Sequence, residues 1–458
     1  MSLSTTRRHR HPVAPAPHGP PALHEPPALH EPAAPHGPSA APLALERYVG
    51  RGSRLAVDGV EYVDCASGTF NLSLGYSQPR LIEALHRQLD RCLHLSSEFT
   101  AETSRQVFDL MRPFLPEQLD AFWFRDVVGS TAVECAVRIA QKATGRTDVV
   151  SLFLSHHGQS VTATGLSGNA FRQRSFSLPV AGSLKIPAPD CANCFYGQTV
   201  DRCGMLCARR LEDFVEYASS GRVAAILVEP ILGNGGNIVP PPAWYGVLRE
   251  VCDRHGILII ADEVQTGFGR TGTFFASTGI AADLRPDILV FAKGAGGVGI
   301  PVAGVLMRSE LDVLEPWEHS STAGANPLAL VALSETVRHF REHPVLERVA
   351  VAGARLRAGL AELERDVDAV TGVRGEGLML AFDLPTSDDV ARLIRLARRH
   401  GLLLRGSRYG FGTTVKVRPP LVVTDDDLTA ILTGLRAALA ELPQDSDLDR
   451  DHPKETQR

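Results

Sequence analysis

The chain has 458 residues, 44% of them hydrophobic, and a formal net charge of −5 at pH 7. This length can bury the core of two lobes, and the weak negative charge gives no reason to expect a nucleic-acid or membrane partner. The sequence has no apolar run close to the roughly 18–20 residues that cross a bilayer, and no signal peptide is evident. Eight cysteines without a secretion signal therefore predict reduced thiols in a cytoplasmic protein.

The two ends of the chain differ in composition from the rest. Residues 1–42 are rich in Pro, His and Ala and repeat the hexapeptide PPALHE at 20–25 and 26–31. Because large apolar side chains are too few to offset the entropy of ordering, we expect a disordered leader. Weak metal binding by its six histidines is the alternative. The charged residues 444–458 are expected to form a disordered tail.

Between these ends, apolar runs alternate with amphipathic stretches. Such alternation is typical of an α/β fold, with a mostly parallel sheet covered by helices on both faces. We expect strands at 121–128, 148–154, 223–228, 256–261, 288–292 and 302–307, and helices at 131–144, 208–219 and 243–255.

The C-terminal part mixes helices and strands differently and is expected to form a smaller α+β lobe. Helices are predicted at 335–363, 388–400 and 425–441, and strands at 378–384 and 414–418. Thr424 and Asp427 have the spacing of a capping box, which marks the start of the last helix. The expected division is 43–100 as the N-terminal part of the small lobe, 101–324 as a large cofactor-binding domain and 325–443 as the C-terminal small domain.

Lys293 and Asp262 follow two of the predicted buried strands, and the chain has only five lysines against 42 arginines. Because the carboxyl ends of parallel strands meet at one edge of a sheet, where ligands gather, we expect the two side chains to lie together. An amine and a carboxylate in this arrangement suit pyridoxal phosphate (PLP). The lysine forms the Schiff base, and the aspartate keeps the pyridine nitrogen protonated. A structural ion pair is the alternative.

Two further strand ends carry residues that suit a cofactor. The run 121–128 leads into Gly129-Ser130 at a predicted helix N-terminus, where free N–H groups and a hydroxyl suit a phosphate. The run 148–154 is followed by His156, whose ring can stack on a flat cofactor, although a buried structural histidine is the ordinary interpretation. Neither signal is specific by itself.

The segment 294–299, Gly-Ala-Gly-Gly-Val-Gly, matches the dinucleotide-binding pattern G-x-G-x-x-G and follows a predicted strand. That fingerprint requires a helix to begin within it. Ile300-Pro301 and the apolar run 302–307 follow instead, so no helix fits. We therefore do not expect a nicotinamide-dependent dehydrogenase.

A series of motifs makes the chain resemble the class III aminotransferases, a subgroup of the fold-type I PLP enzymes, from about Arg47 to Leu442. The motifs are SGTFNLSLGYSQP (67–79), GSTAVECA (129–136), HHG (156–158), VEPILGNGGNIVPP (228–241), ADEVQTGFGRTG (261–272), FAKGAGGVGIPVAG (291–304), STAGANPLA (321–329) and VRPPLVVT (417–424). Their shared order is highly specific. The implied fold has a large lobe with a mostly parallel sheet and a smaller α+β lobe.

The resemblance assigns the cofactor-binding residues. It implies that Lys293 and Asp262 are catalytic and that Gln265 approaches the ring hydroxyl of PLP. Gly129 and Ser130 are the residues that hold the cofactor phosphate.

Two further positions follow from the resemblance. His156 stands where the family usually has an aromatic ring stacked on PLP. Thr322 would reach the phosphate in the neighbouring subunit, which implies a homodimer.

The implied reaction moves an amino group between an amine or amino-acid donor and an aldehyde or ketone acceptor. Decarboxylation, elimination or racemisation on the same scaffold is the alternative, and a non-catalytic homologue is a distant one. Many members of the family bind an α-carboxylate through an Arg where this chain has Lys416, and members that accept ω-amines pair it with a Glu where this chain has Asn234. A lysine lacks the fork that matches a carboxylate in two places.

With both of these positions changed, small free amino acids are expected to be poor donors. The acceptor is expected to be a carbonyl group on a larger molecule, such as a specialised metabolite or a modified peptide terminus. Joint binding of a carboxylate by Lys416 and Arg418 is the alternative.

Four of the eight cysteines fall within seventeen residues, as Cys191-x2-Cys194-x8-Cys203-x3-Cys207. In a reducing compartment this spacing suits a tetrahedral zinc site. Free thiols that pack a loop near the active-site entrance are the alternative.

Overall fold

The structure is a computed structural model that describes residues 47–174, 180, 182–407 and 412–448. The leader predicted over 1–42 lies outside the described residues, as do the last ten residues of the predicted tail. Arg47–Arg458 belongs to one compact unit. Among the helices of the described residues, none combines the length and hydrophobicity needed to span a bilayer.

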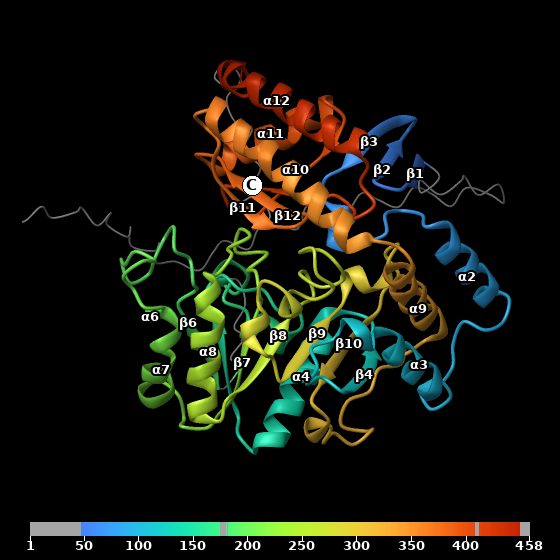
Figure 1. Cartoon of the computed structure of the whole chain (residues 1–458), viewed down its shortest axis with the longest axis vertical. Helices are drawn as coiled ribbons and strands as arrows, with labels where there is room; N and C mark the ends of the chain where they lie inside the picture. The colour runs from blue at the N-terminus through green and yellow to red at the C-terminus, as the bar shows by residue number, and fades with distance from the viewer. Residues whose placement is uncertain (1–46, 175–179, 181, 408–411, 449–458) are drawn as a thin grey trace, which may run out of the picture. The chain divides into compact units, whose positions relative to one another are not determined.

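A seven-stranded sheet forms the centre of the larger lobe (Figure 1). Its strand order is β4-β10-β9-β8-β7-β5-β6. Four of the six pairings are parallel, and β10 is antiparallel to both of its neighbours. The mostly parallel sheet is therefore confirmed. The strands are β4 (Ala121–Asp126), β5 (Asp148–Leu152), β6 (Ser183–Ile186), β7 (Val223–Val228), β8 (Leu258–Asp262), β9 (Ile288–Phe291) and β10 (Ala303–Met307).

Helices bury both faces of this sheet, which explains why its strands are continuous apolar runs. In β7, Ala225 and Leu227 pack under helix α4 (Gly129–Thr144), while Ile226 and Val228 pack under α8 (Pro242–His255). Successive strand residues point to opposite faces, so every residue of β7 is buried. Each large aliphatic side chain buried in this way contributes about 1.5–3 kcal/mol to folding.

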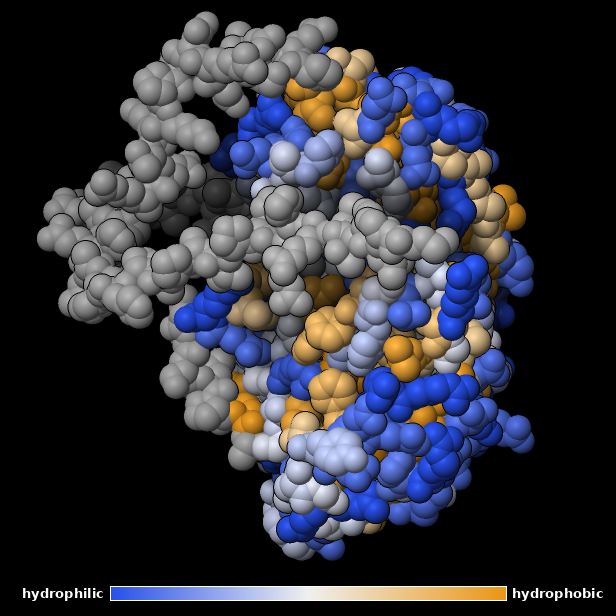
Figure 2. All heavy atoms as spheres, turned by 90° about the vertical axis from the view of Figure 1, so that its left-hand side faces the viewer, coloured by the Kyte–Doolittle hydropathy of each residue, from blue (hydrophilic) through white to orange (hydrophobic). Residues whose placement is uncertain are grey.

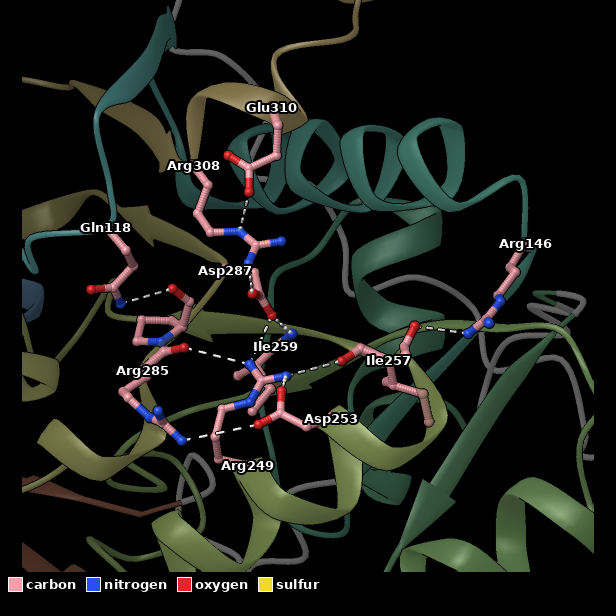
Figure 3. A network of polar contacts seen from close by, with 12 residues as sticks. Gln118, Arg146, Arg249, Asp253, Ile257, Ile259, Arg285, Asp287, Arg308 and Glu310 are labelled. Carbon is pink, nitrogen blue, oxygen red and sulfur yellow. Dashed lines mark hydrogen bonds and ion pairs between the residues drawn. The ribbon is translucent and has the colours of Figure 1, made fainter.

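A network of buried polar contacts ties α8 to the amino ends of the strands (Figure 3). Arg249 on α8 pairs with Asp287 at 2.8 Å, and Asp287 also accepts the backbone N–H of Ile259 at 2.7 Å. Arg308 faces the same carboxylate at 3.4 Å. Removing one partner of such a buried pair costs about 3–5 kcal/mol. Because the network lies at the edge opposite the strand ends that carry Asp262 and Lys293, its role is to hold the scaffold.

The smaller lobe is built from both ends of the described chain and lies above the large sheet in Figure 1. One sheet joins strands from the N-terminal part to a strand from the C-terminal part, because β3 pairs in parallel with β13. The second sheet has the order β11-β12-β15-β14 and is antiparallel. The strands are β1 (Tyr48–Arg51), β2 (Arg54–Val57), β3 (Val60–Asp64), β11 (Thr371–Glu376), β12 (Met379–Asp383), β13 (Leu402–Leu403), β14 (Arg405–Gly406) and β15 (Thr414–Val417).

The remaining helices are α1 (Ser67–Phe70), α2 (Pro79–Leu89), α3 (Ala101–Met111), α5 (Val161–Leu166), α6 (Leu206–Arg209), α7 (Leu211–Tyr217), α9 (Pro327–Glu342), α10 (Val345–Asp366), α11 (Ser387–Arg399) and α12 (Asp425–Leu448). Among them, α10, α11 and α12 pack on the strands of the smaller lobe.

Three predicted helices differ from the observed ones. The single helix predicted over 335–363 is wrong, because α9 ends before His343-Pro344 and α10 begins after it. Proline has no N–H to donate and forces the preceding residue into an extended conformation, and His343 has φ −130° and ψ 148°. The helix predicted over 208–219 is likewise divided into α6 and α7. The last helix begins at the predicted capping box and continues to Leu448, into the predicted tail.

Candidate active site

Asp262 and Lys293 lie at adjacent strand ends, as predicted. Asp262 is the last residue of β8, and Lys293 follows the end of β9 by two residues. The two strands are parallel, with Asp262 opposite Val290. Both side chains line one cavity of about 260 Å³ at the carboxyl edge of the sheet. The strand pairing therefore places the amine and the carboxylate in the same cavity.

Lys293 has an unusual backbone and an unpaired amine. Its φ is +46°, a conformation that costs a residue with a side chain roughly 1–2 kcal/mol. Its Nζ makes no hydrogen bond or ion pair with the described residues. Burial lowers the pKa of Lys293 to about 8, although Asp262 and Glu229 oppose the shift. A lysine that is partly neutral near physiological pH is a competent nucleophile.

His157 holds Asp262 in place, a contact that the sequence analysis did not predict. Nδ1 of His157 lies 2.8 Å from Oδ2 of Asp262, and the backbone N–H of Val264 donates to Oδ1 at 3.1 Å. A carboxylate oxygen accepts hydrogen bonds, so the tautomer of His157 with its proton on Nδ1 is the one that suits this contact. Both side chains are buried. The second histidine of the HHG motif is His157, so the motif contained the residue that could have indicated this contact.

The N-terminus of α4 opens into the same cavity. Gly129 and Ser130 line it, and no side chain caps the first N–H groups of this helix, so they are free for an anion. Ser130 Oγ accepts the N–H of Gln159 at 3.0 Å. A Cβ on Gly158 would lie 2.5 Å from Ser130 Oγ, so only glycine fits beside the hydroxyl. The predicted phosphate site and the Lys293 amine are thus at one cavity.

His156 lies between this cavity and a second one. Thr69, His156 and Lys293 line both. Glu229 accepts the backbone N–H of His156 at 2.8 Å. Burial, together with Arg172 and Lys293, lowers the pKa of His156 to about 3, so its ring is neutral. A neutral imidazole can stack on a flat heteroaromatic ring without the cost of burying a charge.

The second cavity, of about 500 Å³, lies between the two lobes and is lined by several basic side chains. Apart from Lys293, these are Arg172, Arg398, Arg405 and Lys416, and none of the described residues that line it is Asp or Glu. Lys416 is only 3% exposed, yet its Nζ makes no hydrogen bond or ion pair with the described residues. Its Nζ lies 5.7 Å from the centre of the Phe70 ring. Burial, then Arg418, lowers the pKa of Lys416 well below its usual value.

Arg418 does not reach this cavity. Its guanidinium donates to Gln265 Oε1 at 2.7 Å and to the carbonyl oxygen of Gly233 at 3.2 Å, and it contacts Asn237 Oδ1. Gln265 lines the second cavity beside Lys293, so Arg418 orients the amide that was expected to approach the cofactor. Asn234 lines the same cavity, and its buried Nδ2 has no partner in the structure.

Thr322 stands apart from the other predicted site residues. It is exposed and lines neither cavity of its own chain. The structure thus brings Gly129, Ser130, His156, Asp262, Gln265 and Lys293 together around two connected cavities, and leaves Thr322 outside them.

The arrangement fits PLP. Among the described residues, the first cavity combines an unpaired amine, a carboxylate with fixed donors, a free helix N-terminus and a neutral ring, and His156 Nδ1 is buried without a partner. The sequence matches the family model Aminotransferase class-III over residues 37–439. The chain belongs to the class III aminotransferases. It is accordingly a PLP-dependent enzyme that transfers amino groups, with the fold-type I architecture predicted from its sequence.

Individual members of the family are similar over most of their length. The chain is 35% identical to the diaminobutyrate–2-oxoglutarate aminotransferase of Rhizobium meliloti over 408 residues, which cover 84% of this chain and 86% of that protein. It is 33% identical to a 5-aminovalerate aminotransferase of Pseudomonas aeruginosa over 399 residues, or 84% and 91% of the two chains. The PLP-bound amine transaminase of an uncultivated Pseudomonas species has a similar structure. Its TM-score is 0.76 at 29% identity, covering 90% of this chain and 99% of that one.

Proposed function

We propose that this aminotransferase holds PLP in the cavity of Lys293 and Asp262, and that it passes the amino group to an aldehyde or ketone that also carries an anionic group. The observation that carries the proposal is the second cavity. It shares Lys293 with the first, and its other ionisable side chains among the described residues are all bases, with no Asp or Glu.

The catalytic roles follow from the position of each side chain. When bound, PLP supplies an electron sink that makes a hydrogen on the substrate carbon next to the nitrogen acidic. Asp262, positioned by His157, keeps the pyridine nitrogen protonated. Nζ of Lys293 lies at the junction of the two cavities, so it is the base that moves the substrate proton.

The remaining residues of the site orient the cofactor. The first N–H groups of α4, at Gly129 and Ser130, bind its phosphate. His156 stacks on its ring as a neutral imidazole. Gln265, held by Arg418, presents its amide beside Lys293.

The second cavity selects the substrate. Arg398 and Arg405 bring positive charge to this cavity. Burial lowers the pKa of Lys416, and an anion bound beside its amine would favour the protonated form. Diaminobutyrate, 2-oxoglutarate and 5-aminovalerate, named for the two relatives, all carry carboxylates. A cavity of about 500 Å³ is in the range that accepts drug-sized ligands, which supports an acceptor larger than a free amino acid, such as a specialised metabolite or a modified peptide terminus.

A matched pair of aldehydes tests this substrate class. We expect 4-oxobutanoate to have a kcat/KM about 10- to 150-fold higher than butanal, which lacks the carboxylate, because one charge-assisted contact is worth roughly 1.5–3 kcal/mol. Lys416→Met should reduce that ratio while leaving butanal turnover unchanged. Equal kcat/KM values for the two aldehydes in the wild-type enzyme would reject the anionic acceptor.

A second measurement separates amino transfer from the other reactions of the scaffold. With an amine donor and no acceptor, an aminotransferase converts its cofactor to pyridoxamine phosphate in amounts equal to the enzyme. A racemase or decarboxylase instead turns over the donor repeatedly and keeps the cofactor as PLP.

We further propose a homodimer in which Thr322 completes the phosphate site of the partner. Thr322 is exposed and outside the cavities of its own chain, and Trp317 on the same segment is 77% exposed. Phe99 is 72% exposed, and Val128, which lines the first cavity, is also exposed. Large apolar side chains of this kind mark protein interfaces when they are contiguous, and a second copy of the chain would cover them.

Mixing two inactive variants tests the shared site. Lys293→Ala removes the catalytic amine, and Thr322→Glu places a negative charge where the partner's phosphate would bind. If the site is shared, a mixed dimer has one site with both residues intact, so activity returns when the variants are unfolded and refolded together. No recovery, or sedimentation as a fully active monomer, would refute the shared site.

We place this reaction in the cytoplasm. All eight cysteines are free thiols, which is typical of proteins that stay in a reducing compartment.

A further inference from the structure

The four clustered cysteines face one another across a small cavity. Cys191, Cys194, Cys203 and Cys207 all line a space of about 20 Å³, and all four are free. Burial, followed by the neighbouring thiols of Cys191, Cys203 and Cys194, raises the pKa of Cys207 to about 11. Four cysteines from a span of seventeen residues are therefore gathered at one place.

The segment that carries them has little else to hold it. Residues 187–205, between β6 and α6, contain no helix or strand, and loops of this length without secondary structure are uncommon in compact domains unless they have a function. Phe195 packs against Phe153 at 5.7 Å between ring centres, yet it remains 66% exposed. Figure 2 faces the side of the molecule that carries α6 and α7, where hydrophobic residues gather in the middle of the face.

We propose that these four thiols bind one structural zinc ion. Zinc in structural sites takes four ligands in a tetrahedron, and four cysteines in two pairs of close spacing are a common set. The space between the thiols is about large enough for one small ligand. Each thiol gives its proton to the solvent as the Zn–S bond forms, so zinc binding weakens at low pH.

The four thiols line one space but do not form a tight cluster of metal ligands in the described residues. One group of three ligand-type side chains in the described part of the chain lies within 4.8 Å, and it is Asp126, Cys135 and His319. In that group His319 is already paired with Asp126 at 3.0 Å. No three of the four sulfurs in the cysteine segment all lie within 4.8 Å of one another, whereas Zn–S bonds of about 2.3 Å require sulfurs roughly 3.8 Å apart.

Two glycines form turns beside the second and third cysteines of the segment. Gly197 and Gly204 have positive φ values of +65° and +52°, and nothing lies within 4 Å of the place where a Cβ would stand on either. Gly197 donates its N–H to the carbonyl oxygen of Cys194 at 2.9 Å, and Gly204 follows Cys203 directly. The turns beside the second and third cysteines therefore border open space at these two glycines.

The location indicates a structural role beside the active site. Pro241 lies in the wall of the cysteine cavity. It is the last residue of the segment 229–241, which also contains Glu229 and Asn234. Glu229 holds the backbone of His156, and Asn234 lines the second cavity. Zinc would thus stabilise one wall of the entrance without touching the reacting atoms.

Metal analysis of the holoenzyme tests the proposal. Purified without chelator from zinc-supplemented cells, the wild-type enzyme should contain one zinc per chain by mass spectrometry of the elements. Serine at all four positions should abolish the zinc, whereas Cys92→Ser, a control outside the segment, should retain it. The four-serine variant should keep the visible band of bound PLP and show a lower Tm.

The wild-type protein provides a test that does not depend on a variant folding. We expect iodoacetamide to leave Cys191, Cys194, Cys203 and Cys207 unmodified until a chelator is added, as read by peptide mass spectrometry. Zinc below 0.1 per chain together with no uptake of added Zn²⁺ would overturn the proposal. So would iron in place of zinc, disulfides among the four, or zinc retained by the four-serine variant.

Discussion

The contact between His157 and Asp262 permits a sharp test of how the site works. His157→Leu removes one of the two hydrogen bonds that Asp262 receives, and the remaining donor is the backbone N–H of Val264. A buried hydrogen bond to a charged group is worth about 1.5–3 kcal/mol, which corresponds to roughly 10- to 150-fold in rate. Because Asp262 acts on the cofactor, we expect the loss in kcat and in PLP affinity, with little change in KM.

His157→Asn is the matched variant, because an asparagine amide N–H can occupy nearly the place of Nδ1–H. Steady-state kinetics with one donor and acceptor, PLP dissociation constants from equilibrium dialysis, and Tm as a check of folding should be measured for both variants. We expect asparagine to recover most of the activity that leucine loses. Leucine with wild-type kcat, or asparagine as impaired as leucine at equal PLP occupancy, would show that His157 does not act through Asp262.

Four further outcomes follow from the same geometry. Because the pKa of Lys293 is about 8 in the cofactor-free protein, the rate at which added PLP produces its visible band should rise with pH through about 8 and then level off; a midpoint near 10 would contradict the burial effect. Gly158→Ala places a Cβ 2.5 Å from Ser130 Oγ at a backbone φ of +142°, so PLP content measured after purification should fall sharply. Arg418→Leu leaves several buried acceptors unsatisfied and should lower the unfolding free energy by about 3 kcal/mol or more, as measured by urea denaturation. Lys416→Met should raise Tm, and more so at pH 6 than at pH 9. The pKa of Lys416 is lowered in the folded protein, so protonation favours the unfolded chain and the wild type loses stability as pH falls.

The elements that the sequence predicted well are those with a local cause. The runs at 223–228 and 288–292 became buried strands because helices cover both faces of a parallel sheet, so every position is apolar. The spacing of Thr424 and Asp427 formed the capping box as expected. The break at Pro344 also has a local cause, because proline has no N–H and restricts the preceding residue. The helical spacing of apolar residues continues on both sides of Pro344, and for that reason a single helix was predicted.

The sequence by itself determined which residues the site has: the lysine and aspartate after two buried strands, the Gly-Ser turn at a helix start and the ordered family motifs. Only the tertiary structure decided what these residues face. Arg418 and Gln265 are 153 positions apart, yet their bond removes Arg418 from substrate binding. Lys416, two residues before Arg418, points into the second cavity with no partner among the described residues. The sequence of a strand predicts which side chains share a face, because successive side chains point to opposite faces. Which distant residues contact those side chains depends on how the helices and sheets pack, and the local sequence does not predict that packing.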